Sequence, residues 1–199
     1  MTIFNTTELL TNLGSITEEN ISVAQKKIIH LGTNQLNWSP NPDSWNIAEV
    51  LAHLNKYASF YHSTFEEKIN KTRFREPKET FTSSPLGRSA WKSMKLGNAK
   101  NIKRKFKSPK GTNPRIDKEL ITGHETEQFI TQQQHLLRII ESARGVGLRK
   151  VKIPISISRI VRLRLGDALM FVIYHNQRHV QQIINLMNHP KFPKKEHEG

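Results

Sequence analysis

Apolar residues recur every three or four positions in four stretches of the chain, and this spacing is typical of amphipathic α-helices. The best-defined stretch begins with Asn46 and Glu49, whose capping-box spacing marks a helix start, and continues to about Lys71. Ser15 and Glu18 have the same spacing at the start of the first stretch. We therefore predict helices over four ranges: 15–31, 46–71, 123–143 and 166–188.

Two connections between these helices follow other patterns. Prolines and glycines interrupt residues 72–118 too often for a long helix, so we interpret this segment as a crossover with one short helix at 88–96. Residues 151–165 are rich in β-branched side chains, but Pro154 and the lack of a partner strand favour an extended linker. The pattern predicts an all-α fold, a four-helix bundle in which 1–199 form a single domain and the crossover joins the second and third helices.

The chain has 199 residues, which suits one domain, and a net charge of +14 that is concentrated in the crossover. Residues 71–118 contain 15 lysines and arginines against three acidic residues, so the rest of the chain is nearly neutral. The densest basic run, 101–107, can contact phosphates. No recognised nucleic-acid motif accompanies it, however, and we interpret it as a solvated loop.

Composition also limits where the protein acts and what chemistry it can use. No apolar stretch is long enough for a membrane span, and the first ten residues lack the pattern of a secretory signal. We therefore expect a cytoplasmic protein without a membrane partner. The chain has no cysteine, which excludes disulfides, thiolate ligands and a cysteine nucleophile. Any metal site must consist of histidine, aspartate or glutamate.

Three histidines form the strongest chemical signal. His175 and His179 are four residues apart on the last predicted helix, on the face that a bundle buries. Burying unpaired imidazole nitrogens costs roughly 1–3 kcal/mol each, so the pair needs hydrogen bonds or a metal ion. His53 lies on a flank of the second helix that can meet this face. Three imidazoles are typical of an open catalytic zinc site, whereas core histidines with ordinary hydrogen bonds are the alternative.

Other residues are candidates for the surroundings of this site. Glu49 can orient a ligand or act as a base, although its capping position also explains it. Tyr57 can line a pocket, and Gln182, one turn beyond the histidine pair, can hydrogen-bond an imidazole. Arg178 is expected at the surface or in a salt bridge between helices. The remaining histidines, His62 among them, lack the spacing and face of the trio.

Two segments of the chain resemble the signature segments of the DinB-like (YfiT-like) proteins. They are Trp45-Asn-Ile-Ala-Glu-Val-Leu-Ala-His53-Leu and Tyr174-His-Asn-Gln-Arg-His179-Val-Gln-Gln-Ile, and the resemblance extends over residues 31–187. It implies a four-helix bundle that binds a divalent metal ion, zinc or nickel, through His53, His175 and His179. It also implies a metal-dependent enzyme, since characterised relatives transfer low-molecular-weight thiols, isomerise with a thiol cofactor or hydrolyse small substrates. Pairing through helices, and hence a homodimer, is implied as well.

The chain departs from the DinB-like pattern at two positions. Asn176 stands where many relatives have an acid, which removes one acid–base group next to the first histidine of the pair. Asn46 replaces the common serine at the start of the second helix but can still cap it. The first departure bears on activity more than on metal binding.

The leading hypothesis is a metal-dependent hydrolase or small-thiol transferase that acts on a small molecule. A metal-bound water, or a thiolate from a low-molecular-weight thiol cosubstrate, would carry the chemistry at the histidine site. Because three neutral histidines leave the charge of the metal uncompensated, an anionic ligand is expected at the open position. The alternatives are a catalytically silent metal-binding or structural bundle and, less favoured, a nucleic-acid-binding protein.

Overall fold

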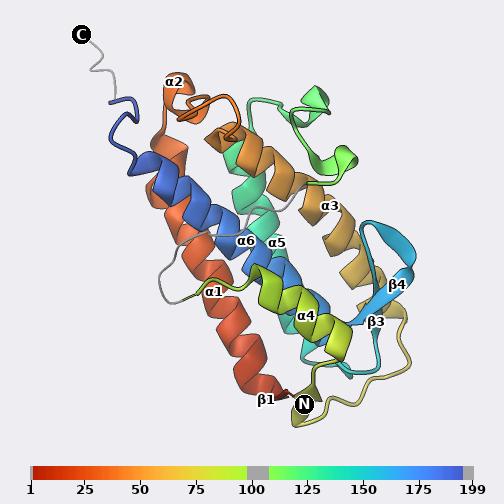
Figure 1. Cartoon of the computed structure of the whole chain (residues 1–199). Helices are drawn as coiled ribbons and strands as arrows, with labels where there is room; N and C mark the ends of the chain where they lie inside the picture. The colour runs from red at the N-terminus through yellow and green to blue at the C-terminus, as the bar shows by residue number, and fades with distance from the viewer. Residues whose placement is uncertain (1, 98–107, 195–199) are drawn as a thin grey trace.

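The computed structural model describes residues 2–97 and 108–194, and this part of the chain is mostly helical (Figure 1). The basic run 101–107 lies outside the described residues. The α-helices are α1 (Thr6–Lys26), α2 (Thr33–Leu36), α3 (Ile47–Lys71), α4 (Pro85–Met94), α5 (Glu125–Ala143) and α6 (Leu165–Met187). Three 3-10 helices span Ile28–His30, Lys110–Thr112 and Lys118–Leu120. The strands are β1 (Ile3–Asn5), β2 (Thr80–Thr82), β3 (Lys152–Ile155) and β4 (Ser158–Arg164).

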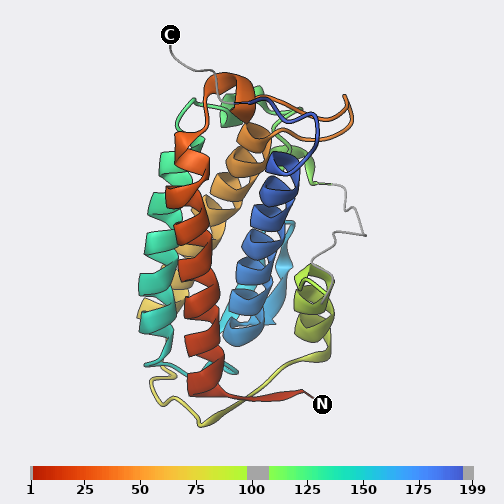
Figure 2. The same cartoon turned by 90° about the vertical axis from the view of Figure 1, so that its left-hand side faces the viewer.

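The four long helices lie side by side, with α1 and α3 each in contact with both α5 and α6 (Figure 2). Each of the four therefore packs against two neighbours, and their apolar stripes meet in the interior. Helix α4 lies outside this group, against α6. The all-α class is confirmed, apart from two small antiparallel sheets, β1–β2 and β3–β4. None of the helices in the described ranges combines the length and hydropathy that crossing a bilayer requires.

Helix α3, which carries His53, starts where its capping signal predicts. The Asn46 side chain accepts a hydrogen bond from the Glu49 backbone N–H at 2.7 Å, and the Glu49 carboxylate accepts from the Asn46 N–H at 2.9 Å. Two donors that the helix start leaves without intrahelical partners are thus satisfied. The predicted third and last helices also agree with α5 and α6 to within two residues at each end.

The prediction that the first helix begins at Ser15 is wrong. Helix α1 begins at Thr6, and its cap is Asn5, whose side chain accepts from the Glu8 N–H at 3.0 Å. Three buried leucines extend the apolar stripe toward the N-terminus: Leu9, Leu10 and Leu13. Ser15 therefore lies in the interior of a continuous helix, where its spacing to Glu18 has no capping role.

The prediction of an extended linker at 151–165 is also wrong, because β3 and β4 form an antiparallel hairpin. The partner strand is the second half of the same segment, joined through a turn at 156–157. The register of the two strands shifts directly after Pro154, at a β-bulge. Proline is tolerated there because not every backbone N–H beside a bulge forms a hydrogen bond between the strands. The hairpin is stabilised by burial of Ile153 and Leu163, which face each other, and by contact with α3 and α6.

Helix α4, which belongs to the crossover, packs against the long helix α6. Ser84 caps this helix through the Gly87 N–H at 2.9 Å, and Trp91 is buried. The fully buried Asp167 of α6 accepts hydrogen bonds from the Ser83 hydroxyl at 2.5 Å and the Ser84 hydroxyl at 2.8 Å. A Cβ at Gly87 would lie 2.1 Å from the Asp167 side chain, so only glycine permits this approach. These contacts fix the start of α4 on α6.

Candidate metal centre

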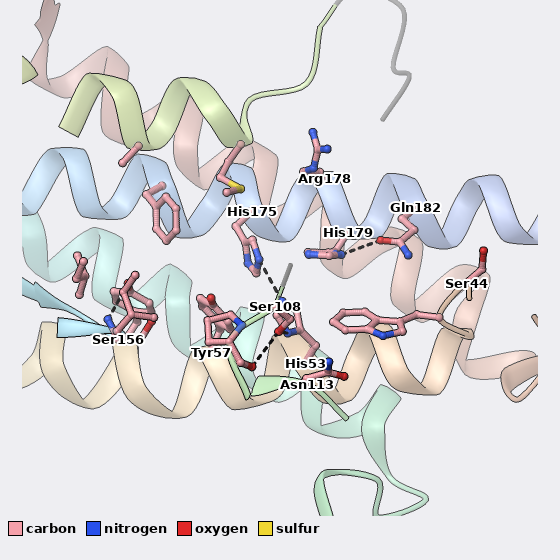
Figure 3. Close-up of a pocket in the computed structure, with 18 of the residues that line it drawn as sticks. Ser44, His53, Tyr57, Ser108, Asn113, Ser156, His175, Arg178, His179 and Gln182 are labelled. Carbon is pink, nitrogen blue, oxygen red and sulfur yellow. Dashed lines mark hydrogen bonds between the residues drawn. The ribbon is translucent and has the colours of Figure 1, made fainter. Parts of the chain in front are cut away.

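Helices α3 and α6 bring the three predicted histidines together. The ring centroids of His53 and His175 are 5.1 Å apart, and each lies within 5.0 Å of the ring of His179. The two helices run antiparallel here, because Tyr57, one turn after His53, lies 4.6 Å from the ring of His175. The regular periodicity of both helices therefore places residues from distant parts of the sequence at one point (Figure 3).

The ring nitrogens of this trio converge as metal ligands do. One ligand nitrogen from each histidine lies within 4.8 Å of the other two, and His53 Nε2 is 3.2 Å from His175 Nε2. Tetrahedral zinc with Zn–N bonds of about 2.0–2.1 Å requires nitrogens separated by about 3.4 Å. The donor set therefore fits a divalent transition-metal ion, and the group can hold one.

Hydrogen bonds at the opposite ring nitrogens orient two of the three imidazoles. His53 Nδ1 lies 2.7 Å from the backbone carbonyl oxygen of Thr112, and His179 Nδ1 lies 2.9 Å from the Gln182 side-chain oxygen. Since these oxygens accept, each Nδ1 carries the proton and each Nε2 keeps its lone pair for a ligand bond. His175 Nδ1 is buried and has no hydrogen-bond partner among the described residues.

Burial keeps these imidazoles neutral. It lowers the pKa of His53 from 6.5 to about 4 and that of His179 to about 3. The pKa of His175 is held well below 6.5, first by burial and then by the neighbouring histidines and Arg178. At neutral pH all three rings thus present lone pairs rather than positive charges, which is the protonation state that metal binding requires.

The trio opens onto a cavity of about 830 Å³, a size typical of small-molecule sites. Trp45 forms part of its wall and packs on two of the ligand candidates, with ring centroids 5.0 Å from His53 and 6.4 Å from His179. Tyr57 also lines the cavity, as predicted, and burial raises the pKa of its hydroxyl. A ligand in this cavity reaches the histidines directly.

The structure places Gln182 and Glu49, two of the residues expected around the site, differently. Gln182 contacts a ligand candidate, as its spacing predicts. Glu49 is occupied elsewhere: besides capping α3, its carboxylate pairs with Arg115 Nε at 2.8 Å, and it is not among the described residues that line the cavity. The capping interpretation of Glu49 therefore holds, and a role as base at this site has no geometric support.

The expectation of a surface position for Arg178 is wrong, and so is the expectation that Asn176 removes a group next to the histidines. Arg178 is buried and lines the cavity, because α4 covers a face of α6 that a bundle of four helices would leave to solvent. Asn176 is buried on the other side, where its amide donates to the Gln133 side chain of α5 at 3.4 Å. An acid at position 176 would thus face α5 rather than the histidines, and the asparagine removes no group from the cavity.

The crossover supplies contacts that sequence reasoning missed. Thr112 provides the carbonyl that orients His53, and the Ser108 hydroxyl lies 3.4 Å from the same Nδ1. Both residues lie more than fifty positions from His53 in an irregular segment, so no periodicity indicates them. The sequence indicates only that a buried imidazole needs a hydrogen-bond partner for its second nitrogen, and it does not identify that partner.

Comparison with known families agrees with this geometry. The sequence model of the DinB superfamily matches residues 28–183, which include α3, most of α6 and all three histidines. The chain belongs to the DinB superfamily. Comparison with curated proteins and with solved structures gave no significant match.

Proposed function

We propose that this protein is a divalent-metal-dependent enzyme, a hydrolase or small-thiol transferase built on a DinB-type four-helix bundle, in which His53, His175 and His179 bind zinc or nickel. The single observation that carries the proposal is the convergence of three neutral imidazole nitrogens, within 4.8 Å of one another, on the wall of a ligand-sized cavity. Membership of the DinB superfamily supports it.

The ligand set leaves room for chemistry. Three protein nitrogens leave at least one position of a zinc or nickel ion open. When bound, such an ion supplies a Lewis acid that favours anionic oxygen or sulfur groups near neutral pH. The Thr112 carbonyl and the Gln182 amide hold the protons of His53 and His179 away from the open position. The protein lacks cysteine, so any thiol must come from a cosubstrate.

Two cavity residues would act on the substrate. The Tyr57 hydroxyl, whose pKa burial raises, stays protonated at neutral pH and would donate a hydrogen bond to a ligand oxygen or leaving group. Arg178 also lines the cavity, but its side chain projects from α6 away from His175 and His179 (Figure 3), so its positive charge would favour an anionic substrate group only at longer range. Neither side chain is proposed as a metal ligand.

The decisive experiment measures the metal content of protein purified without a histidine tag. We expect about one zinc or nickel ion per chain in the wild type, and its loss in the His53→Ala and His175→Ala variants. His30→Ala, an exposed histidine outside the trio, is the matched control and should keep the metal. Wild-type protein that stays metal-free after incubation with zinc and with nickel at neutral pH would overturn the proposal.

Turnover and assembly need separate measurements. The metal-loaded protein should hydrolyse a small ester or amide, or transfer a small thiol to an electrophile, and the His175→Ala variant should not. A homodimer, proposed from the resemblance to DinB-like proteins, predicts twice the mass of the chain in light scattering at micromolar concentration.

A further inference from the structure

The cavity has two chemically different ends, one on each side of the histidines. Toward the start of α6, the ring of Phe171 faces Tyr61 of α3 with centroids 6.2 Å apart. The hairpin and α4 complete the wall on this side (Figure 3). We call this end the apolar arm, and six of its residues define it: Tyr61, Ala90, Met94, Val161, Leu163 and Phe171.

The other end, toward the end of α6, is polar. Asp43, Ser44, Gln182, Asn185 and His189 line it beside the apolar Trp45 and Leu186, and we call the five polar residues the polar mouth. The described cavity-lining residues that carry a formal charge at neutral pH, one aspartate and one arginine, both lie outside the apolar arm. The histidine trio separates the two ends.

The apolar arm disfavours polar groups. A polar group that enters it loses water, and it finds few hydrogen-bond partners there, because aliphatic and aromatic side chains dominate the wall. The polar exceptions are the Ser156 side chain and the Tyr61 hydroxyl, and that hydroxyl accepts from the Ser156 N–H at 3.3 Å. An alkyl or aryl group instead gains free energy in proportion to the apolar area it buries.

We propose that the substrate is amphipathic: an alkyl or aryl group occupies the apolar arm, a polar group occupies the polar mouth, and the reacting group between them lies beside the histidines. The placement of the reacting group rests on the proposed function, whereas the preference of the arm for apolar groups does not. Fully polar substrates, such as small sugars or amino acids, are thereby disfavoured.

Straight-chain alkylhydroxamic acids test the proposal on zinc-loaded protein, because the hydroxamate binds the metal and the chain enters the arm. Calorimetry should show affinity rising about fourfold for each added methylene, the value expected for burial of one CH2 group. Hexanohydroxamic acid, with four more methylenes, should thus bind about two-hundredfold more tightly than acetohydroxamic acid. Equal affinity along the series would overturn the inference while leaving the metal site intact.

Two neighbouring hairpin residues provide a matched pair of variants. Val161 lines the arm, whereas Ile160 is 92% exposed and does not line the cavity. Val161→Asn should reduce the hexanohydroxamate affinity about tenfold with little effect on acetohydroxamate, and Ile160→Asn should change neither. Ala90→Trp should fill the arm and give the same selective loss. If Val161→Asn and Ala90→Trp keep the full dependence on chain length, as the control Ile160→Asn should, the alkyl chain binds outside the arm and the inference fails.

A second series separates this inference from the metal site. Straight-chain alcohols carry no metal-binding group, so their binding to metal-free protein reports on the arm alone. Affinity that rises from butanol to octanol, and falls in Val161→Asn, supports the arm even if the protein binds no metal. In that case the proposed metal-dependent function is wrong, but the preference of the apolar arm for apolar groups is supported. A flat alcohol series overturns the arm whether or not the metal binds.

Discussion

Helix α3 carries two buried histidines with different surroundings, and their comparison separates a candidate ligand from a buried base. His53 faces α6 and the cavity, with one ring nitrogen anchored on Thr112 and the other 3.2 Å from His175. His62 lies against α5, where its ring contacts His135 at 5.1 Å between centroids. Neither nitrogen of His62 has a well-formed hydrogen bond among the described residues.

Burial has the same electrostatic effect at both places. It lowers the pKa of His53 and of His62 to about 4 from the ordinary 6.5. A low pKa therefore does not distinguish a metal site from a buried imidazole. The two histidines differ in what surrounds their ring nitrogens. Around His53, three histidine nitrogens converge, and hydrogen bonds at Nδ1 orient two of the three rings. His62 belongs to no such group in the described residues.

The largest expected effect is on metal affinity. His175→Ala should weaken zinc binding by more than about a hundredfold, because removal of a ligand costs more than loss of an outer contact. Added zinc should then raise the melting temperature of the wild type but not of this variant. His62→Leu serves as the contrasting variant and should keep the zinc-dependent rise. A rise of the same size in His175→Ala would remove the distinction between the two histidines.

The second effect is the cost of protonating His62. Its folded-state pKa is about 4 and its unfolded-state value about 6.5, so the unfolded chain binds the extra proton between these values. The contribution of His62 to stability is fully present above pH 6.5 and is lost as the pH falls to 4, by about 3 kcal/mol at most, and protonation of His53 and His179 adds to the loss in the wild type.

Urea unfolding of metal-free protein across this range checks the cost. His62→Leu should show a correspondingly smaller loss of unfolding free energy between pH 6.5 and pH 4 than the wild type. Parallel pH dependences of the two proteins would contradict the assignment of that loss to His62.

A smaller effect is expected at the outer contact of His179. Gln182→Ala removes the acceptor 2.9 Å from Nδ1 and should weaken zinc affinity about 10-fold to 100-fold. Gln181→Ala, whose side chain bonds to Asn185 on the exposed face, is the neighbouring control. Competition with a zinc-sensitive dye measures both. Equal affinities in the two variants would mean that Gln182 does not orient the ring.

The smallest effect is expected at Glu49. Glu49→Ala removes half of the capping box and the pair with Arg115, at a cost of about 1 kcal/mol in unfolding free energy. Zinc affinity should change little, because the carboxylate does not line the cavity. A hundredfold loss of zinc affinity in a folded Glu49→Ala variant would restore a role for Glu49 at the metal centre.

Local patterns predicted the parts of the site that lie on regular helices. The capping pair at Asn46 and the apolar stripe placed His53, and the four-residue spacing placed His175 and His179 on one face. These features depend on neighbours within two turns, so the sequence displays them directly. The anchoring of His179 by Gln182 follows from the same periodicity.

Nonlocal contacts account for the features that the sequence did not predict. The burial of Arg178 depends on α4, which belongs to the crossover and packs on α6. The hairpin was missed because Pro154 lies beside a bulge that only the paired strands reveal. The early start of α1 was missed because Ser15 and Glu18 imitate a cap in the interior of the helix.

The anchor of His53 is a main-chain atom, and this has a consequence for how the protein tolerates change. The Thr112 side chain helps to hold that atom in place, because its hydroxyl lies 2.9 Å from the Ser108 hydroxyl and donates to the Pro109 carbonyl at 3.1 Å. Insertion or deletion of a residue between 108 and 112 would move the carbonyl and release the ring. Selection on the imidazole would therefore preserve both the length of this stretch and a hydroxyl at position 112.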